Sequence, residues 1–200
     1  NINGGILQGG GGLISTDVNI NSGGALGPGL SLGTMNVTGD VAFNSGGAFN
    51  VEVAAGLASD VLNVTGNVNV NPGAVMNVIA FGGYTGTLAD NFANVISASG
   101  SLSGTFTTVN QDPAFNVADN YAATSMSLLV SSFTNFWDAG GNGTTWQDPL
   151  NWSLDVVPTF EHDTFINLAT TVTKSDVAAD AVNSLTTVVG SLLDIAAGSL

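Results

Sequence analysis

The chain has 200 residues, of which 44% are hydrophobic and only 8% are charged, and its formal net charge is −14. Lys174 is its single Lys or Arg residue, and it contains no cysteine. Nucleic-acid binding and phosphoryl transfer both rely on Lys or Arg to neutralise phosphate, so the composition excludes the first and argues against the second. The lack of cysteine rules out disulfides, thiol nucleophiles and cysteine-ligated zinc. With no run of about 18 apolar residues, the sequence predicts no membrane-spanning helix.

Glycine and asparagine recur at short intervals and separate short runs in which apolar and polar residues alternate. Alternation with a period of two predicts β-strands with one buried face, and frequent glycine is unfavourable for helices. In the first part of the chain these runs lie at 35–38, 41–44, 49–53, 62–65 and 68–71. Further strands are expected at 92–98, 102–109, 121–130, 182–189 and 192–195. The chain is therefore expected to be all-β.

An internal repeat is the strongest signal in the sequence. MNVTGDVAFNSGGAFNV at 35–51 aligns with LNVTGNVNVNPGAVMNV at 62–78, at an offset of 27 and with 9 identities in 17 positions. An earlier copy at 17–25 aligns with 40–48 at an offset of 23. Short strands and glycine turns with a period in the twenties are typical of one coil of a parallel β-solenoid. The alternative is a β-sandwich of hairpins with coincidental similarity between its strands.

The alignment also predicts which side chains stack from coil to coil. The expected solenoid core consists of matching apolar positions: Val18, Val41 and Val68, and next to them Ile20, Phe43 and Val70. Asn21, Asn44 and Asn71 fall at one turn of the repeat. Stacked amides at such a turn are expected to form a hydrogen-bonded ladder.

These motifs resemble the Gly/Asn-rich β-solenoid stretches of large bacterial surface and secreted proteins, including autotransporter-type passengers and related adhesins. The resemblance is carried by NSGGALGPG at 21–29, LGTMNVTGD at 32–40, FNVEV at 49–53 and SDVLNVTG at 59–66. It covers about residues 1–131. It implies a parallel β-solenoid (β-helix) and an extracellular or cell-surface location, and it says little about activity.

Three segments are expected along the chain. Residues 1–80 are interpreted as β-solenoid coils, and residues 81–131 as an irregular β segment that closes the open end of the stack. Residues 132–200 are interpreted as a Trp-containing motif that leads into a second β-solenoid block. This motif, W…W…NW…P, resembles one found at the start of repeat blocks in secreted bacterial solenoid proteins.

Two candidate binding sites lie in the Trp-containing motif. Trp137, Trp146 and Trp152 form either a glycan-stacking platform or an aromatic plug over the first open coil, and exposed rings would favour the platform. The acidic, Asn-rich loop that follows Trp137 offers Asp138 and Asn142 as oxygen ligands for calcium. Loosely bound calcium is accordingly the one cofactor considered.

The sequence predicts no catalytic residue and no enzymatic activity. Polysaccharide lyases built on β-solenoids generally use Lys or Arg as a base, whereas hydrolases need two converging carboxylates. Only Lys174 is available as a base. Asp17, Asp40 and Asp60 are assigned to the repeat, whereas Asp90, Asp112 and Asp119 are scattered, and no two carboxylates pair by their spacing. His162, which lies between two acidic residues, is interpreted as a solvated turn residue rather than a ligand or an acid–base group.

The sequence therefore predicts an extracellular, bacterial structural protein that forms a stiff rod. Edge strands are usually protected by Lys or Pro, and this chain has one Lys and 5 Pro, so association end to end into a filament or surface layer is expected. The alternative is an adhesin or glycan-binding module of a larger secreted or autotransported protein. The expected partners are further copies of the chain or, in the alternative, a surface glycan; nucleic acid and membrane insertion are not expected.

Overall fold

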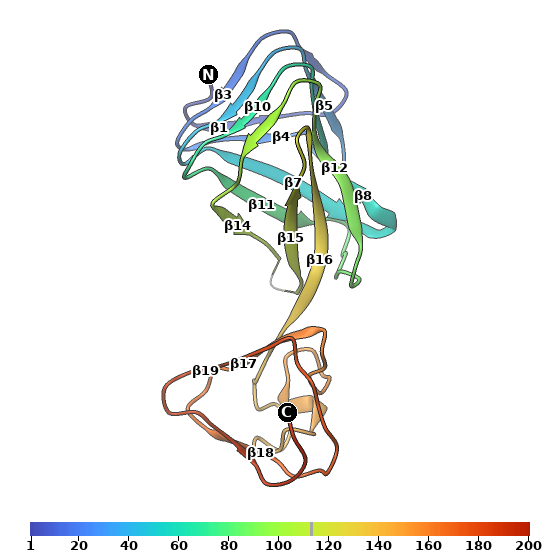
Figure 1. Ribbon diagram of the computed structural model, residues 1–200, viewed down its shortest axis with the longest axis vertical. Coiled ribbons are helices and arrows are strands. Elements are labelled where there is room, and N and C mark those ends of the chain that lie inside the picture. The colour runs from blue at the N-terminus through green and yellow to red at the C-terminus, as the bar shows by residue number, and fades with distance from the viewer. Residues whose placement is uncertain (113) are drawn as a thin grey trace. The chain divides into compact units, whose positions relative to one another are not determined.

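The computed structural model describes residues 1–112 and 114–200. The chain is nearly all β, and most of its strand pairs are parallel (Figure 1). It divides into two compact units: unit 1 comprises residues 1–112 and 117–130, and unit 2 comprises residues 114–116 and 131–200. Within the described ranges, no helix is long and apolar enough to cross a membrane.

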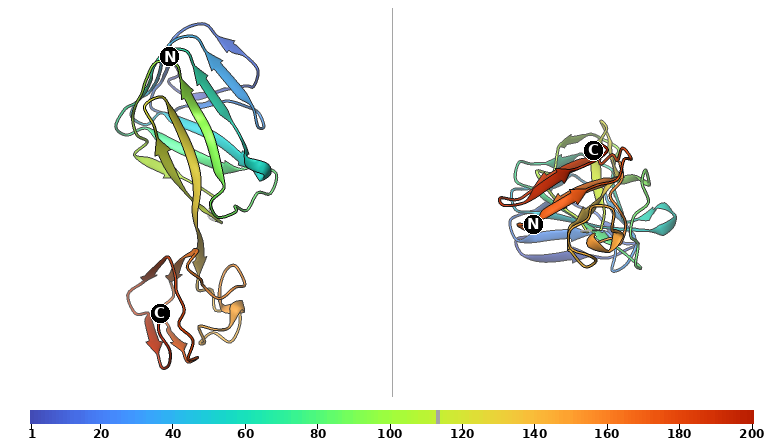
Figure 2. Two further views of the ribbon diagram at one scale, coloured as in Figure 1. Left: turned by 45° about the vertical axis from the view of Figure 1, so that its right-hand side comes forward. Right: turned by 90° about the horizontal axis from the view of Figure 1, so that it is seen from below.

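Three sheets form unit 1, and the chain passes through them repeatedly in the same order. One sheet contains β1 (Gly5–Gln8), β4 (Gly24–Gly27), β7 (Ala48–Ala54), β11 (Val75–Ala80) and β14 (Thr108–Asn110), with β8 (Ala58–Ser59) beside β7. A second contains β3 (Val18–Ile20), β6 (Val41–Phe43), β10 (Val68–Val70) and β13 (Leu102–Gly104). The third contains β2 (Leu13–Ile14), β5 (Thr34–Val37), β9 (Val61–Val64), β12 (Asn91–Ala98) and β16 (Ser125–Phe136), with β15 (Asn116–Tyr121) beside β16. Strands from successive repeats thus lie next to each other (Figures 1 and 2).

The register between neighbouring strands follows the sequence repeat. Val41 pairs with Val18 on one side and with Val68 on the other, and the matching steps in the chain are 23 and 27 residues. The next step, from Asn69 to Ser103, is 34 residues long. It is longer because the connection from β11 to β12 carries additional residues at 81–90. The parallel pairing continues across this insertion.

Glycine permits the turns that follow β3, β6 and β10, the equivalent strands of successive repeats. Gly23, Gly46 and Gly73 occupy equivalent positions and have φ values of 78°, 72° and 87°. This left-handed region is strained for residues that carry a Cβ. The glycine of the recurring Asn-x-Gly is therefore required by the backbone conformation.

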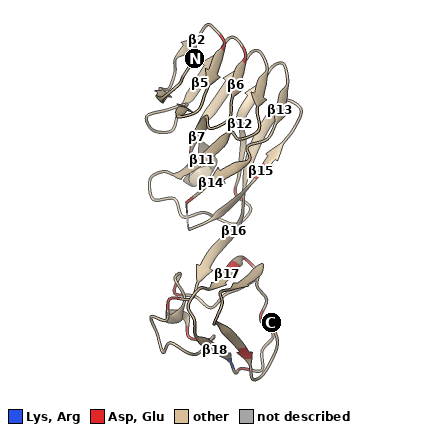
Figure 3. Cartoon of the chain, turned by 90° about the vertical axis from the view of Figure 1, so that its left-hand side faces the viewer, with Lys and Arg blue, Asp and Glu red and all other residues tan. Residues whose placement is uncertain are grey.

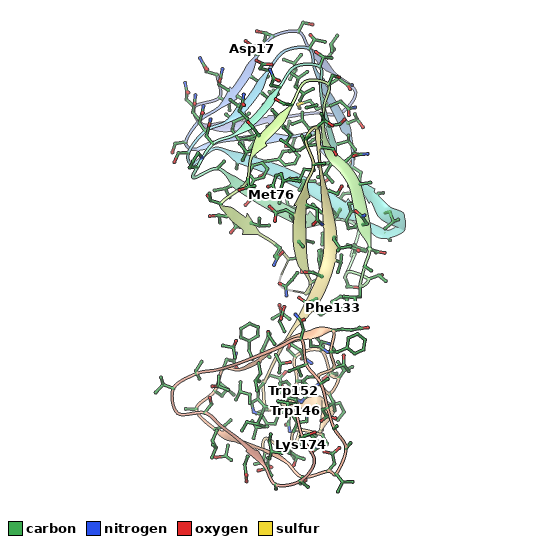
Figure 4. All side chains as sticks on the ribbon, in the orientation of Figure 1. Asp17, Met76, Phe133, Trp146, Trp152 and Lys174 are labelled. Carbon is green, nitrogen blue, oxygen red and sulfur yellow. The ribbon has the colours of Figure 1, made fainter. Side chains whose placement is uncertain are left out.

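The interior of unit 1 is filled by the inward-facing residues of the three sheets. The rings of Phe43, Phe49 and Phe106 meet there, with centroids 5.3 to 6.1 Å apart. Met76, labelled in Figure 4, is also fully buried. Burying a side chain of this size contributes about 1.5–3 kcal/mol. The alternation of buried and accessible residues along β5, β6 and β7 explains why these segments form strands.

The last part of unit 1 departs from the parallel pattern. β12 pairs parallel with β9 but antiparallel with β16, and its register shifts between Phe92 and Ile96. The prediction of one strand across 102–109 is wrong, because Gly104, at φ 75°, ends β13 before β14 begins at Thr108. Residues 121–130 are likewise not one strand, because the chain turns between β15 and β16.

Unit 2 contains the end of β16, the short 3₁₀ helix η2 (Pro149–Asn151) and four further strands: β17 (His162–Ile166), β18 (Thr171–Lys174), β19 (Ser184–Thr187) and β20 (Leu192–Ile195). β17 lies between β16 and β19, and β18 pairs with β20; all of these pairs are parallel. Asn183 and Ser184 follow Asp163 at steps of 20 and 21 residues. Strands that follow one another at intervals of about 20 residues thus pair in parallel in unit 2, as they do at longer intervals in unit 1.

Candidate functional site

The first candidate site is the asparagine ladder at the turn of the repeat. Asn44 donates its side-chain N–H to Asn21 Oδ1 at 2.7 Å and accepts a hydrogen bond from Asn71 Nδ2 at 2.8 Å. Asn21 in turn donates to Asn3 Oδ1 at 2.7 Å. Every amide in this row donates toward the preceding repeat, so the ladder has one direction along the stack.

Two further ladders were not identified from the sequence. Asn110 donates to Asn77, and Asn77 donates to Asn50, with N···O distances of 2.8 and 2.7 Å. Asn63 donates to Asn36 at 3.1 Å. The signal was available, because Asn50 and Asn77 match in the 27-residue alignment. Pairs of this kind join one strand to the next in addition to the backbone bonds.

A row of acceptors at another turn fixes the same stacking. Asp17 Oδ1 accepts from the backbone N–H of Asp40 at 2.9 Å, and Asp40 Oδ1 accepts from that of Asn67 at 2.7 Å. Asn67 Oδ1 then accepts from the backbone N–H of Ser101 at 3.1 Å. Asp17 is labelled at the turn in Figure 4. These carboxylates are therefore part of the repeat structure and do not converge on a substrate.

The predicted core residues lie at matching positions on neighbouring strands. Val18, Val41 and Val68 are in one register, and Ile20, Phe43 and Val70 are in another. All six are buried. The structure thus brings together each predicted set, and the ladder of Asn21, Asn44 and Asn71 runs along the turn beside it.

The outermost strands of unit 1 are open at their outer edges. Among the strands of the described ranges, none pairs with the outer side of β1 or β2, whereas β3 is bridged at Ile20 by Ile2, which also exchanges backbone hydrogen bonds with Asn19 and Asn21. Leu13 on β2 is 63% exposed, and a hollow of about 170 Å³ beside it is lined by Leu7, Ile14 and Met35. Unpaired backbone next to accessible apolar side chains is a template for another β-strand.

In unit 2, the three predicted Trp residues form a buried cluster. Trp137, Trp146 and Trp152 all have 0% exposure, and Trp152 contacts both others edge to face at centroid distances of 5.0 and 4.8 Å. Trp152 Nε1 donates to the Trp146 carbonyl at 2.9 Å. Figure 4 shows Trp146 and Trp152 within the unit. These indoles cannot stack against a sugar in this arrangement, because no ring face is accessible.

The predicted calcium ligands are engaged in holding their own loop. Asn142 Oδ1 accepts from the backbone N–H groups of Thr144 and Thr145, each at 2.9 Å, and from Asn151 Nδ2 at 3.1 Å. Asp138 Oδ1 accepts from the backbone N–H of Gly140 at 3.0 Å. A cation at Asn142 would have to displace these donors. In the described ranges, no three His, Asp or Glu side chains are grouped as a metal site would require.

Lys174, the single Lys or Arg, ends β18, where Figure 3 has its one blue segment. Its side chain, labelled in Figure 4, is fully buried. Its Nζ donates to Asp176 and, at 2.8 Å, to the carbonyl of Ala178, and it lies 3.3 Å from Asp180 Oδ2. Burial alone lowers the pKa of Lys174, but the hydrogen bonds to the two carboxylates outweigh it and raise that pKa. The cation therefore holds the 175–180 segment against β18.

A second polar cluster joins the strands of unit 2 around Asp163. Its carboxylate accepts from Ser132 and from Asn116 (3.0 Å) on one oxygen, and from Asn183 (2.8 Å) and Ser184 (2.6 Å) on the other. Burial raises the pKa of Asp163, but these four hydrogen bonds stabilise the charged form and the net effect is a lowered pKa.

The neighbouring His162 is not a solvated turn residue, which corrects the prediction from sequence. It begins β17 with 7% exposure, and its Nδ1 accepts from the backbone N–H of Thr159 at 2.8 Å. Burial lowers the pKa of His162, although Glu161 and the Thr159 hydrogen bond oppose this effect. The neutral imidazole thus fixes a turn.

Asp60, which the sequence analysis assigned to the repeat with Asp17 and Asp40, lies outside their row of acceptors and next to Glu52. Asp60 is 2% exposed and accepts from the backbone N–H groups of Gly33 (2.8 Å) and Glu52 (3.0 Å). Burial raises the pKa of Asp60 despite these two bonds. Burial and the nearby Asp60 charge also raise the pKa of Glu52, whose Oε2 is buried without a hydrogen-bond partner. The enclosed Asp60 joins the 28–33 loop to β7 and is not open to a substrate.

Comparison with known proteins does not assign the chain to a family: no protein-family model matches it, and no curated protein matches it at a significant level.

Proposed function

We propose that the chain is a β-solenoid segment of an extracellular structural protein, related in kind to the repeat stretches of bacterial surface proteins, and that it forms a stiff rod. The observation that carries the proposal is the repeated register of unit 1, in which each repeat adds one strand to each of three parallel sheets. Side-chain ladders at the Asn21–Asn44–Asn71 turn and between β7 and β11 hold neighbouring repeats together. In a stack of this kind, each repeat contacts only its neighbours, which makes the assembly extensible in one direction.

We further propose that copies associate end to end through the open strands β1 and β2. The first 30 residues contain only one carboxylate, Asp17, although the net charge of the chain is −14. Little charge therefore opposes association at β1 and β2, and the accessible Leu13 supplies apolar surface there. An alternative role as an adhesin that uses Trp137, Trp146 and Trp152 gains no support, because these side chains are buried.

Electron microscopy of the purified chain at neutral pH tests this function. The chain is compared at low and high salt and with and without a chelator, because salt screens the repulsion between acidic copies. Regular filaments with a constant axial repeat are the expected result. Filaments that dissociate on chelation would add calcium as a linker, whereas monodisperse monomers in every condition would refute self-association.

Two matched variants locate the contact. Leu13→Lys places a charge on the open edge, whereas Ile79→Lys places the same charge on the outward face of β11, where Ile79 is paired with Glu52 of β7. We expect the first variant to abolish filaments and the second to retain them. Filaments that survive Leu13→Lys but not Ile79→Lys would place the contact on a lateral face instead.

A further inference from the structure

A cavity of about 350 Å³ opens on unit 1 between two loops that the stacking does not require. One wall is the η1 turn (Ala55–Leu57), and the other is formed by residues 83–87 together with Asp90. The second wall belongs to the insertion that lengthens the repeat step to 34 residues. The volume lies within the range of small-ligand sites and suits a single sugar residue.

The wall of the cavity is held in one conformation by a hydrogen-bond network. The buried Tyr84 hydroxyl donates to Asp90 Oδ2 at 2.7 Å and accepts from the backbone N–H of Thr87 at 3.3 Å. The Tyr84 ring packs edge to face on Phe92, with centroids 5.6 Å apart. Asp90 is further tied to β16, because its carbonyl accepts from the Val130 N–H at 2.9 Å. A site that is already ordered loses little conformational entropy when a ligand binds.

The lining of the cavity combines hydrogen-bonding groups with a small apolar patch. Thr85 and Thr87 are exposed, and Asp90 contributes a carboxylate. Open space lies beside Gly56 and Gly83, so no side chain covers their backbone. Leu57 is 52% exposed at the rim. Hydroxyl and carboxylate groups match the vicinal hydroxyls of a sugar, and an exposed Leu side chain matches its C–H face.

The charges exclude two other ligand classes. Lys174, the only Lys or Arg, belongs to unit 2, so the cavity has no cation to hold a phosphate, sulfate or carboxylate. Asp90 is the only carboxylate in the lining, whereas calcium requires six to eight oxygen ligands and usually several acidic ones. The lining therefore favours an uncharged ligand that is rich in hydroxyl groups over an anion or calcium.

We propose that this cavity binds one residue of a neutral saccharide, with the Asp90 carboxylate accepting hydrogen bonds from two neighbouring sugar hydroxyls. The proposal does not depend on self-association, because the cavity lies wholly within one chain. It also differs from the sugar platform predicted at the Trp residues, which are buried in the other unit.

Saturation-transfer NMR on the full chain tests the proposal, with methyl glycosides of glucose, galactose, mannose and N-acetylglucosamine as probes and with EDTA present. We expect at least one probe to bind with a Kd of about 1–10 mM, as is usual for one sugar held by a few hydrogen bonds. Asp90→Asn removes the charge-assisted hydrogen bonds and is expected to weaken binding about tenfold. Ala55→Trp fills the cavity from an exposed position and is expected to abolish binding.

Asp155→Asn is the matched control, because Asp155 is an exposed carboxylate in unit 2. Circular dichroism establishes that each variant is folded, and Ala55→Trp keeps the test valid if Asp90→Asn unfolds the loop. Loss of binding in Ala55→Trp with retention in Asp155→Asn supports the site. The proposal is overturned if no probe binds at 50 mM, if binding survives Ala55→Trp, or if binding appears only when calcium replaces EDTA.

Discussion

Removing Asn44 tests whether the asparagine ladder stabilises the stack. Asn44 is a middle member, with one side-chain hydrogen bond to Asn21 and one from Asn71. Asn44→Ala deletes both bonds and leaves one acceptor and one donor without partners. At about 1 kcal/mol for the part-buried bond to Asn21 and about 0.5 kcal/mol for the exposed bond from Asn71, the free energy of unfolding should fall by about 1.5 kcal/mol. Asn3→Ala removes a single exposed bond at the end of the row and should lose about 0.5 kcal/mol.

The direction of the ladder gives a second, sharper comparison. In Asn44→Asp, the carboxylate can still accept from Asn71 but presents an oxygen to Asn21 Oδ1, which is also an acceptor. At pH 7 this variant should be at least as unstable as Asn44→Ala. It should recover stability below about pH 4, where a protonated carboxyl can donate again.

Urea unfolding monitored by far-UV circular dichroism measures these effects. With a denaturant slope of about 2 kcal/mol/M, a loss of about 1.5 kcal/mol lowers the midpoint by about 0.75 M. All three Trp residues belong to unit 2, so their fluorescence reports that unit separately. Equal midpoints for Asn44→Ala and Asn3→Ala, or wild-type stability of Asn44→Asp at pH 7, would show that the ladder does not stabilise the stack.

Three further predictions concern buried charge. Trypsin should not cut the folded chain, because its single Lys or Arg, Lys174, is buried. Gel analysis should show fragments 1–174 and 175–200 only under unfolding conditions. Rapid cleavage of the native chain would contradict the burial of Lys174. The raised pKa of Glu52 means that its ionisation opposes folding, so this penalty is absent in acid and appears as pH rises through that pKa. Glu52→Gln should therefore raise the free energy of unfolding by about 0.5 kcal/mol at pH 7 and leave it unchanged near pH 3. Urea midpoints at both pH values measure the difference. The lowered pKa of Asp163 means that its stabilisation is complete above its ordinary value of 3.8 and is lost as pH falls through the lower, folded-state value. Trp fluorescence should accordingly show a lower urea midpoint at pH 2 than at pH 5, and this difference should shrink in Asp163→Asn.

The strands of the repeat could be predicted because their signals are local. Alternation at 49–53 and the Asn-x-Gly turn at 44–46 each reflect a backbone requirement that acts within a few residues. The register between Val41 and Val68 follows from the alignment, since parallel strands in a stacked repeat place equivalent residues side by side. The same alignment also matches Asn50 with Asn77, but the ladder that they form was not predicted.

The antiparallel pair of β12 and β16 could not be predicted in the same way. Nothing in the local pattern of 92–98 distinguishes a parallel neighbour from an antiparallel one, and β12 has one of each. The cavity beside Tyr84 was also beyond the sequence, because its two walls are about 30 residues apart in the chain and meet only after folding.

The sequence alone determined the all-β character of the chain, the period of its repeat and the absence of basic groups that could bind phosphate, because composition and local alternation suffice for each. The tertiary structure decided where single polar and aromatic side chains lie. Trp137, Trp146 and Trp152 became a buried cluster, Lys174 became a buried cation held by Asp176 and Asp180, and His162 became a buried residue at the start of β17. The physical reason is that burial and hydrogen-bond partners depend on contacts between distant segments, which no short window of sequence specifies.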